Sequence, residues 1–470
     1  MTSASTACAQ VAGAAPLPAS VLRQFDVAGP RYTSYPTADR FVEAFGADDY
    51  ASALRARRDA GASAPPLSLY VHIPFCESLC YYCACNKVVT RHPERAVQYL
   101  AYLERETRLQ AAQLGRRATV SQLHLGGGTP TFLSDAQLGG LLAMLRESFD
   151  LSAGGEQSIE IDPRTVDAAR LANLAALGFN RLSFGVQDFD PDVQKAVHRI
   201  QPAHQVFALM ADARALGFKS INVDLIYGLP RQNDASFART MEQVCELRPD
   251  RIALYAYAHL PERFKPQRRI AAEDLPDAQM RVRMLSSAIA TLTAAGYVYI
   301  GMDHFALPDD PLAVAKRQGR LQRDFQGYST QPEGDLVALG VSAIGRIGTT
   351  YSQNAKTVDT YYDLLDQGRL PVVRGIALSR DDVLRRAVIM ALMCKGRVGF
   401  DDMGEAHCID FRHHFAAEFA ALGPLAAQGF VRVTDHDVEV TAEGWFVVRA
   451  IAMVFDRYCR DNRTRFSRVV

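Results

Sequence analysis

Four cysteines lie close together in the stretch FCESLCYYCACN at residues 75–86. Cys76, Cys80 and Cys83 are spaced C-x3-C-x2-C, and Cys85 follows two residues after the third of them. Such neighbours are too close to join separate elements of a fold by disulfides, whereas thiolates are preferred ligands of soft metal centres. The spacing therefore predicts a metal or iron–sulfur site on one short loop.

A zinc site is the first alternative, with Cys85 as the fourth thiolate. Structural zinc usually takes paired C-x2-C or Cys/His units from two segments, and no second pair follows in this sequence. Cys83 and Cys85 are also so close that holding both on one tetrahedral ion would strain the loop. A [4Fe–4S] cube bound by Cys76, Cys80 and Cys83 fits better, because it leaves one iron open to a ligand from outside the protein. Cys85 is then either a small pocket-lining side chain or a redox-active one.

A glycine run and three polar residues stand at the ends of strand-like segments. In LGGGTP, Gly127 and Gly128 end such a segment, where glycine lets the backbone approach a ligand closely. Glu160, Gln187 and Asp224 occupy similar places in three later segments, where apolar residues would be expected. Each one alone is explained by a solvated strand end or by an ion pair inside a barrel. Their shared position at one end of a barrel favours a ligand-binding shell.

Strands and helices alternate through the central part of the chain. Runs rich in β-branched and aromatic residues predict strands at 67–73, 121–127, 158–162, 180–186, 220–228 and 251–258. Helical periodicity lies between and after them, at 96–114, 134–149, 166–178, 202–217, 235–248 and 276–296. The alternation predicts an α/β fold with a partial (β/α)6-type parallel barrel, whose functional residues lie at the carboxyl ends of the strands. An open doubly wound sheet is the alternative that the pattern leaves open.

Three segments are expected along the chain. Residues 1–60 predict a flexible tail and an N-terminal arm with a short helix, because the start lacks the basic and apolar parts of a signal peptide. Residues 61–374 are expected to form the barrel with a C-terminal extension. In residues 375–470, helical patterns at 379–396 and 411–429, followed by a hairpin and a last helix, predict a small, mostly helical C-terminal domain.

The composition is that of an ordinary globular protein, with 48% hydrophobic and 22% charged residues. The 52 Lys and Arg residues balance the 52 Asp and Glu residues, so no overall field attracts nucleic acid or anionic lipid. The nine cysteines are odd in number and irregularly spaced, which argues against a secreted disulfide framework. No apolar run reaches the length of a membrane span. We therefore expect a cytoplasmic protein with no nucleic-acid partner and no membrane span.

The cysteine spacing directly after the first predicted strand resembles the radical S-adenosylmethionine superfamily, and LGGGTP is similar to its glycine-rich segment. The resemblance implies a [4Fe–4S] cluster whose open iron binds the amino and carboxylate groups of S-adenosylmethionine. It further implies that one electron from the cluster cleaves the sulfonium and releases a 5′-deoxyadenosyl radical. The protein would then orient the cofactor, exclude water and direct the radical at one C–H bond.

The flanking sequence resembles one family within this superfamily, the oxygen-independent coproporphyrinogen III oxidases. The similar segments span nearly the whole chain after its Ala/Ser-rich start and include SLYVHIPFC, CACNK, HLGGGTPTFL, SIEIDPR, FNRLSFGVQDF, NVDLIYGLP, YAHLP, GMDHFA, PRYTSYPTA and RFSRVV. The resemblance implies oxidative decarboxylation of coproporphyrinogen III to protoporphyrinogen IX in haem biosynthesis, with two propionates becoming vinyl groups. It also implies two S-adenosylmethionine molecules bound at once.

The resemblance also assigns residues to these groups. The cluster ligands are Cys76, Cys80 and Cys83. The first cofactor molecule is assigned to Tyr70, Gly127, Glu160 and Ile344, and the second to Tyr82, Gly128, Thr129, Gln187, Arg199, Asp224 and Ala258. Carboxylates and amides can hydrogen-bond ribose and amino groups, arginine can bind a carboxylate through two N–H groups, and tyrosines offer aromatic faces. For Ile344, plain core packing is an equally good explanation.

The expected partners are coproporphyrinogen III and a reductant protein such as a flavodoxin or a ferredoxin, and we expect a monomer. Because the substrate carries four carboxylates, cations are expected near the mouth of the barrel. Arg31 in the PRYTSYP arm is the candidate, with Tyr32 and Tyr35 as lid residues. A plain surface cation explains Arg31 equally well.

Two alternative functions are left open by the sequence. A haem chaperone of the same superfamily would bind haem rather than catalyse. Such members resemble this chain in the barrel and the cysteine loop, but they usually lack the cysteine of CAC and the RYTSYPTA arm, which are both present here. A zinc-stabilised nucleic-acid-binding protein is the more distant alternative, and the balanced charge and the missing second ligand pair count against it.

Overall fold

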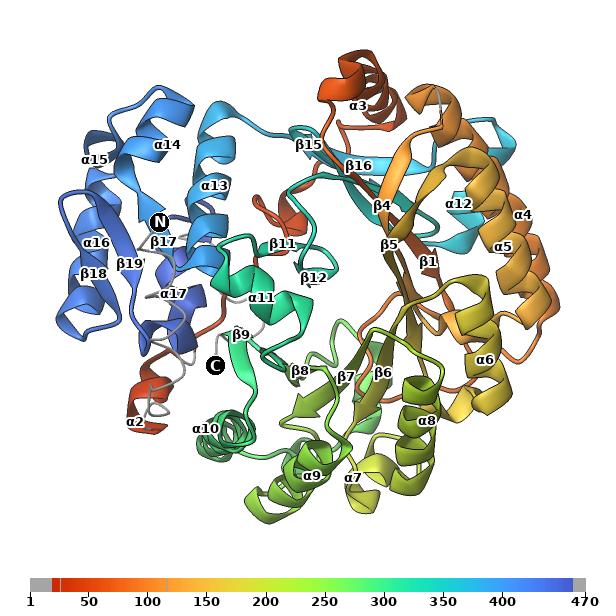
Figure 1. The fold of residues 1–470 in the computed structure, drawn as a ribbon, viewed down its shortest axis with the longest axis horizontal. Helices are drawn as coiled ribbons and strands as arrows, with labels where there is room; N and C mark the ends of the chain where they lie inside the picture. Colours follow the sequence, from red (N-terminus) through yellow and green to blue (C-terminus); the bar gives the residue numbers. More distant parts are fainter. Residues whose placement is uncertain (1–18, 26, 116, 460–470) are drawn as a thin grey trace.

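The structure, a computed structural model, describes residues 19–25, 27–115 and 117–459, and its centre is one large curved sheet (Figure 1). Within the described residues this sheet has 12 strands in the order β16-β15-β14-β13-β1-β4-β5-β6-β7-β8-β10-β9. The six strands of the barrel, all parallel, are β1 (Leu67–Ile73), β4 (Thr119–Gly127), β5 (Asp150–Ile161), β6 (Arg181–Gln187), β7 (Ser220–Tyr227) and β8 (Arg251–Ala256).

The strand order distinguishes the two predicted architectures. In a doubly wound sheet the order reverses at a switch point, but here each parallel strand is added on the same side of the one before it. The predicted partial (β/α)6-type barrel is therefore confirmed, and the doubly wound alternative is wrong. Beyond β1 the sheet continues with β13 (Asp335–Leu339), which is parallel to β1, and then with the antiparallel strands β14 (Ile344–Ile347), β15 (Thr350–Asn354) and β16 (Val372–Ala377). Beyond β8 it continues with the antiparallel strands β10 (His304–Ala306) and β9 (Val298–Gly301).

Helices cover the outer face of the curved sheet (Figure 1). They are α4 (Glu94–Leu114), α5 (Asp135–Ser148), α6 (Ala168–Leu177), α7 (Pro191–Ala196), α8 (Ala203–Ala215), α9 (Asp234–Leu247) and α10 (Ala278–Ala294). Local sequence sets their ends: the Ser134 hydroxyl accepts a hydrogen bond from the Gln137 N–H at the start of α5, and Gly178 ends α6 at a φ of 102°. Apart from α7, which leads into α8, each of these helices thus leads the chain to the next strand.

Alternate residues of the parallel strands face opposite sides of the sheet. On β5, Ile159 and Ile161 belong to the hydrophobic core of the protein, whereas Glu156, Ser158 and Glu160 line the interior of the barrel. Burial of the apolar set stabilises the fold by about 25 cal/mol for each Å² removed from water. The same alternation leaves a polar barrel interior, which is available for a ligand.

The N-terminal segment contains α2 (Ala19–Leu22), the 3-10 turns η1 (Arg23–Phe25) and η2 (Ala38–Arg40), and helix α3 (Ala47–Ala60). Helix α3 is the predicted short helix, and it packs against α4 and strands β14–β16. The predicted flexible tail lies for the most part in residues 1–18, outside the described residues.

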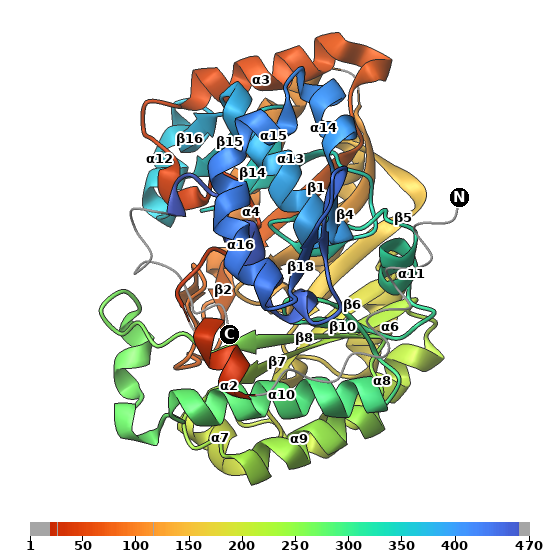
Figure 2. The ribbon, with the colours of Figure 1, turned by 90° about the vertical axis from the view of Figure 1, so that its left-hand side faces the viewer.

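The C-terminal elements lie across the open side of the curved sheet (Figures 1 and 2). They are α13 (Arg380–Lys395), β17 (Arg397–Gly399), α14 (Phe400–His407), α15 (Phe411–His414), α16 (Ala416–Ala427), β18 (Val431–Val433), β19 (Asp437–Val440), η8 (Gly444–Val447) and α17 (Val448–Met453). The mostly helical character is as predicted. The helical pattern predicted at 411–429 is confirmed as two helices, α15 and α16, which are divided where the backbone leaves the helical region at Phe415. The segment boundary near residue 375 stays a prediction.

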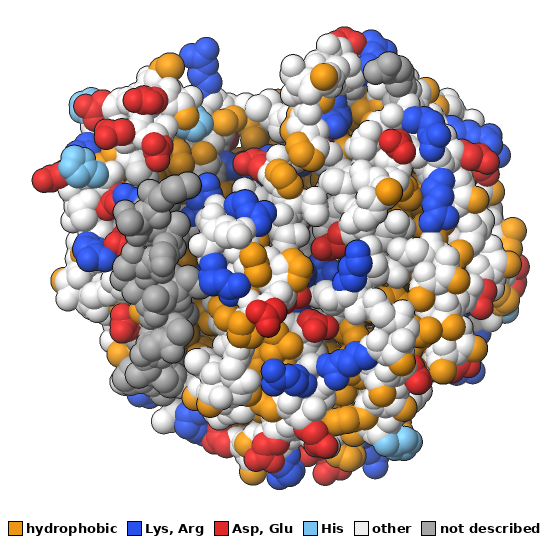
Figure 3. Space-filling view, in the orientation of Figure 1, with side chains coloured by type: hydrophobic (Ala, Val, Ile, Leu, Met, Phe, Trp, Pro, Cys, Tyr) orange, Lys and Arg blue, Asp and Glu red, His pale blue; other side chains and the backbone are white. Residues whose placement is uncertain are grey.

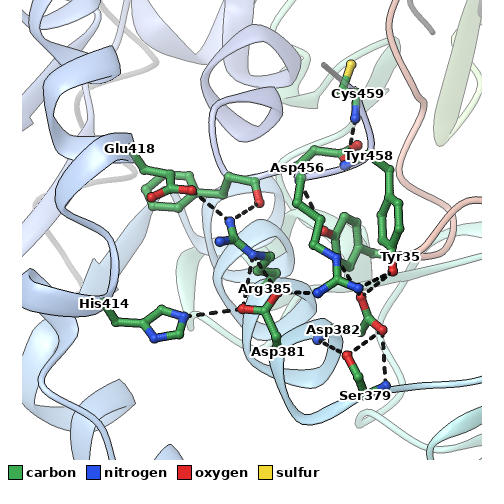
Figure 4. Close-up of polar contacts among 12 residues, drawn as sticks. Tyr35, Ser379, Asp381, Asp382, Arg385, His414, Glu418, Asp456, Tyr458 and Cys459 are labelled. Atoms are coloured by element: carbon green, nitrogen blue, oxygen red, sulfur yellow. Dashed lines mark hydrogen bonds and ion pairs between the residues drawn. The ribbon is translucent and has the colours of Figure 1, made fainter. Parts of the chain in front are cut away.

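A polar network joins the beginning of α13 to the end of the described chain and to the N-terminal arm (Figure 4). The Arg385 guanidinium binds Asp381 and Glu418, each at 2.9 Å. The Tyr458 hydroxyl donates to Asp382 over 2.9 Å, and the Tyr35 hydroxyl accepts from the Arg457 N–H over 3.3 Å. Segments that are far apart in the sequence are thereby held together beside the open side of the barrel.

The remaining elements are short. They are η3 (Gly61–Ser63), β2 (Phe75–Cys76), β3 (Val88–Val89), η4 (Pro130–Phe132), η5 (Pro163–Thr165), η6 (Lys265–Arg269), η7 (Ala272–Asp274), α11 (Pro311–Arg317), β11 (Gln322–Asp324), β12 (Gly327–Ser329) and α12 (Val358–Asp366). In the described part of the chain, no helix has both the length and the apolar character that crossing a membrane requires.

Candidate active site

One cavity of about 300 Å³ lies at the carboxyl ends of the parallel strands. Most of the residues assigned from the sequence line it together: Cys76, Cys80, Tyr82, Cys83, Gly127, Gly128, Thr129, Glu160, Gln187, Arg199 and Asp224. These residues come from the cysteine loop, from four different strands and from the segment after α7. The fold therefore gathers groups that are up to 148 positions apart in the chain, between Cys76 and Asp224.

The cysteine loop is closed by backbone hydrogen bonds. After β1, the short strands β2 and β3 pair in parallel, with Cys76 beside Val89. The Thr90 N–H donates to the Cys76 carbonyl oxygen over 2.9 Å, and the Lys87 ammonium donates to the Cys83 carbonyl oxygen over 2.9 Å. These contacts hold the loop over the end of the barrel with its thiols toward the cavity.

The thiols differ in their electrostatic surroundings. Burial raises the pKa of the Cys76 thiol to about 11, although the Thr129 hydroxyl opposes this shift. A hydrogen bond from the neighbouring Cys85 thiol, together with the positive charge of Lys87, lowers the pKa of Cys83 to about 6. The same contact raises the pKa of Cys85 well above its ordinary value. Cys83 is thus the more acidic member of this pair, as suits a metal ligand.

The arrangement of the thiols bears on the choice between zinc and a cube. Among the described residues, no three His, Cys, Asp or Glu side chains converge as the ligands of one metal ion do. Instead Cys76, Cys80 and Cys83 border one cavity, as a [4Fe–4S] cube requires, because its cysteines bind different irons. The donor set therefore fits the iron–sulfur cluster better than a single zinc ion.

The glycine run lies against the cysteine loop with no room for side chains. A Cβ atom at Gly128 would lie 2.6 Å from the Pro74 carbonyl oxygen, and one at Gly127 would lie 2.7 Å from the His72 ring. Gly127 also has a φ of 118°, which residues with a side chain rarely adopt. The Gly128 N–H donates to the Ile73 carbonyl oxygen over 2.8 Å. Glycine is thus required here to bring the end of β4 against the loop and the cavity.

Two arginines and one carboxylate surround Cys80. Arg199 Nη1 lies 3.5 Å from the Cys80 sulfur and 3.1 Å from Asp162, and Arg164 Nη2 lies 3.6 Å from the same sulfur. Burial acts to raise the pKa of the Asp162 carboxyl, but Arg199 and Arg164 lower it below its ordinary value. Three charged groups with one net positive charge therefore lie beside a cysteine of the loop.

Glu160 lies at the centre of a smaller network on β1, β4 and β5. Its carboxylate accepts from the Gly127 N–H over 3.0 Å and lies 3.4 Å from His124 Nε2. Burial opposes ionisation, but the contacts with His124 and Gly127 lower the pKa of Glu160. Tyr70 stacks on His124 with the ring centroids 5.9 Å apart, and its hydroxyl lies 3.0 Å from His72 Nδ1.

Asp224 projects from β7 into the same interior. It accepts hydrogen bonds from Asn222 over 2.9 Å and from the Ser183 hydroxyl over 3.1 Å. Burial and the nearby charge of Glu160 raise the pKa of Asp224 to about 6. The Asp224 carboxyl is therefore balanced between its two protonation states in mildly acidic solution.

Three assigned residues do not line the cavity. Tyr70 reaches Glu160 only through His124, as described above. The Ala258 carbonyl oxygen accepts from Gln267 over 3.1 Å, and Gln267 also donates to the Tyr82 carbonyl oxygen over 3.0 Å, so Ala258 is tied to the cysteine loop. Ile344 is half-buried at the start of β14, beyond β13. This position does not support the assignment of Ile344 to the first cofactor molecule.

The N-terminal arm brings Arg31 to the interior. The Arg31 guanidinium pairs with Asp303 and lies over the Tyr255 ring, 5.0 Å from its centroid, and Tyr255 lines the cavity. Burial, followed by repulsion from Arg449, lowers the pKa of Arg31 to about 9. Tyr32 and Tyr35, expected to be lid residues, are fully buried and anchor the arm; the Tyr32 hydroxyl donates to Asp456 over 3.0 Å.

Sequence reasoning missed several residues of the cavity. Lys87, Asp162, Arg164 and Tyr255 line it together with the assigned residues. Polar residues at alternate positions of strands with apolar neighbours could have indicated other inward-facing residues, such as Glu156 and Ser158 on β5, which line the adjoining part of the barrel interior. Asp162 and Arg164 lie just after β5, where no periodic pattern is available.

Known proteins resemble this chain over almost its whole length. Residues 70–244 match the radical SAM superfamily, and residues 378–447 match the HemN C-terminal domain. An oxygen-independent coproporphyrinogen III oxidase of Pseudomonas aeruginosa is 51% identical over 455 residues, which cover 96% of this chain and 98% of that protein. The protein of the same name from Escherichia coli K12 is 48% identical over 453 residues, with the same shares covered.

A solved structure also resembles the structure of this chain over almost its whole length. It is described as "Coproporphyrinogen III oxidase (HemN) from Escherichia coli is a Radical SAM enzyme". The two structures have a TM-score of 0.87 at 48% sequence identity, and the match covers 92% of this chain and 100% of that chain.

Proposed function

The chain belongs to the oxygen-independent coproporphyrinogen III oxidase family of the radical SAM superfamily, and we propose that it converts coproporphyrinogen III to protoporphyrinogen IX in haem biosynthesis without oxygen. In this reaction each of two propionates loses a hydrogen atom from its β carbon, one electron and carbon dioxide, and a vinyl group remains. The observation that carries the proposal is the single cavity in which three spaced cysteines, a glycine-lined strand end and inward-facing polar residues meet.

The cofactors and the chain have separate tasks. When bound, the [4Fe–4S] cluster and S-adenosylmethionine supply a 5′-deoxyadenosyl radical that removes the hydrogen atom. Cys76, Cys80 and Cys83 would hold three irons of the cluster, and Lys87 fixes their loop. Arg199 and Arg164 place positive charge beside Cys80, which favours the electron-rich form of a cluster. The strands and the arm enclose the reacting groups and keep water away from them.

The count of two S-adenosylmethionine molecules belongs to this proposal. Gly128, Thr129, Gln187, Arg199 and Asp224 line the cavity beside the cysteine loop and would hold one molecule. Glu160 with Gly127, and Tyr70 through His124, would hold the other further toward the barrel interior. We also propose that the protein acts in the cytoplasm as a monomer.

Substrate binding needs cations, because coproporphyrinogen III carries four carboxylates. Arg31 is the candidate, since the arm carries it to a ring that lines the cavity. Its guanidinium already pairs with the Asp303 carboxylate, and the fixed fork of N–H donors that makes this pair is also suited to a substrate carboxylate.

Anaerobic reconstitution tests the function directly. The purified protein, loaded with iron and sulfide, is incubated with coproporphyrinogen III, S-adenosylmethionine and dithionite. We expect protoporphyrinogen IX, measured as protoporphyrin after oxidation, together with 5′-deoxyadenosine. Stable haem binding without decarboxylation would instead support the haem-chaperone alternative, and zinc in place of iron and sulfide would reject both.

A further inference from the structure

A cationic surface adjoins the outer side of the cysteine loop. Residues 259–270 contain four cations and one carboxylate, in a chain whose charges balance overall at 52 of each sign. Figure 3 shows the contrasting situation on the face of Figure 1, where positive and negative side chains are mixed. We call Lys265, Arg268, Arg269 and Lys356 the cationic rim; all four are exposed, and among the described residues none of them forms an ion pair with a carboxylate.

The cationic rim contacts the loop that carries the cluster ligands at two points. Tyr81 lies between Cys80 and Cys83 in the chain. Arg269 Nη1 lies 3.3 Å from the Tyr81 hydroxyl, and the Arg269 guanidinium lies 5.2 Å from the centroid of the Tyr81 ring. Further along the same loop, the Asn86 amide donates to the Lys356 carbonyl oxygen over 2.9 Å. A protein seated on the rim would therefore lie directly over the loop that holds the cysteines.

Like charges crowd one another around Lys356. Partial burial, followed by repulsion from Arg374 and Arg263, lowers the pKa of the Lys356 ammonium. The exposed carboxylates nearest to the rim in the sequence are Glu262, Glu273 and Asp359, with Glu77 in the cysteine loop, and in the described part of the chain none of them forms an ion pair with the four rim cations. A local surplus of positive charge is thus left facing solvent, as expected for a surface that meets an acidic partner.

Apolar side chains are exposed next to the same loop. Val89, which pairs with Cys76, is 43% exposed, and Ile200 is 64% exposed. Ile200 lies two residues after His198, whose ring stacks on the Tyr81 ring with the centroids 5.1 Å apart. Protein interfaces commonly combine such apolar and aromatic contacts with a charged rim.

We propose that the cationic rim and its apolar neighbours Val89 and Ile200 dock an acidic one-electron carrier protein. The proposal rests on the proposed function, because it takes Cys76, Cys80 and Cys83 as the ligands of the cluster to be reduced. The carrier loses one electron and the oxidised cluster gains it; with flavodoxin as the carrier, the flavin hydroquinone anion becomes the neutral semiquinone. Docking over the loop shortens the path of that electron, and opposite charges raise the rate of encounter.

The test compares two double charge reversals in the cluster-loaded protein. Lys265→Glu with Lys356→Glu changes the cationic rim without touching the cavity. Lys219→Glu with Arg248→Glu is the matched control, because both residues are exposed and precede β7 and β8 at the opposite end of the barrel. Reduction of the cluster by flavodoxin hydroquinone is followed through the absorbance of the cluster, in the absence of coproporphyrinogen III. Binding of oxidised flavodoxin is measured by calorimetry.

At low ionic strength the rim variant should be reduced by flavodoxin at least about tenfold more slowly than wild type and should bind it more weakly by a similar factor. Added salt should lower the rate at which flavodoxin reduces the wild type and the control variant, but it should change this rate little in the rim variant. Reduction by dithionite should stay within about twofold in all three proteins. Equal flavodoxin rates in the rim variant and the wild type would overturn the proposal. Since no product is measured, a failure of decarboxylation does not affect this outcome.

Discussion

The guanidinium of Arg199 lies 3.5 Å from the sulfur of Cys80, so a buried positive charge touches a residue that we assign as a cluster ligand. The segment after α7 and the cysteine loop are 119 positions apart in the chain, and only the closed barrel brings them together. The contact couples the electrostatics of the barrel wall to the proposed redox centre.

Replacement of Arg199 by Gln should therefore lower the reduction potential of the cluster. Loss of a positive charge next to Cys80 destabilises the electron-rich form, since net charge and hydrogen bonds to the sulfurs set such potentials. Redox titration followed by electron paramagnetic resonance measures the shift. Arg199→Lys should recover much of it, because the charge is kept. A potential unchanged in Arg199→Gln would show that the contact is structural.

Replacement of Cys80 by Ser should abolish both the iron–sulfur absorbance and all turnover. The thiolate is buried at the edge of the cavity, and a hydroxyl is a poor ligand for the cluster. Iron and sulfide analysis with a decarboxylation assay checks this. Cys408→Ser, at an exposed cysteine of the C-terminal segment, is the control and should keep both properties. A brown, active Cys80→Ser protein would refute the ligand assignment.

Replacement of Gly128 by Ala should displace the cysteine loop. The added Cβ would meet the Pro74 carbonyl oxygen at 2.6 Å and the Phe75 carbonyl oxygen at 2.8 Å, and neither backbone atom can turn aside. We expect a loss of stability of about 1–3 kcal/mol and a reduced iron content after reconstitution. Gly140→Ala on α5 is the matched control, because no atom lies within 4 Å of its Cβ position. That change should stabilise the helix by about 1 kcal/mol.

Replacement of Asp224 by Asn should leave the cluster in place but depress product formation, since the carboxylate is proposed to bind a cofactor molecule. Its effect on stability should depend on pH. The folded-state pKa of about 6 lies above the ordinary value, so ionisation of Asp224 costs the wild type stability as the pH rises through about 6.

At pH 8 the cluster-free Asp224→Asn protein should therefore be more stable than wild type by up to about 3 kcal/mol, at 1.36 kcal/mol for each unit of pKa. Below about pH 4 the difference should vanish, because Asp224 is then protonated in both folded and unfolded chains. Urea unfolding at a series of pH values measures it. If the free energies of unfolding of the two proteins differ by the same amount from pH 4 to pH 8, the raised pKa of Asp224 is contradicted.

Replacement of Arg31 by Gln should raise the KM for coproporphyrinogen III about 10- to 100-fold, the usual worth of a charge-assisted hydrogen bond. Cluster content and S-adenosylmethionine binding should be unchanged. Asp303→Asn, which removes the internal partner of Arg31 but keeps the cation, serves as the comparison. If Arg31 acts only as a structural partner of Asp303, the two variants should have the same KM.

Sequence patterns were sufficient for the elements of the barrel. Strand β1 occupies the residues predicted for it, because LSLYVHI combines β-branched and aromatic residues with a Pro directly behind it. The cysteine spacing and the glycine run were also readable, since each is a local requirement of one loop or one turn. Local patterns do not show strand order, and the choice between an open barrel and a doubly wound sheet had to wait for the pairing of β1 with β4 and of β7 with β8.

The sequence by itself thus determined which groups could bind an iron–sulfur cube and which segments would be strands and helices, because these depend on neighbouring residues. Only the tertiary structure decided that Arg199 and Arg164 meet Cys80, that Arg31 reaches Tyr255, and that Arg269 and Lys356 both contact the cysteine loop. These pairs come from remote segments, and their distances follow from the closure of the barrel and the packing of the arm against the C-terminal elements. Long-range contacts of this kind leave no periodic trace in a single sequence.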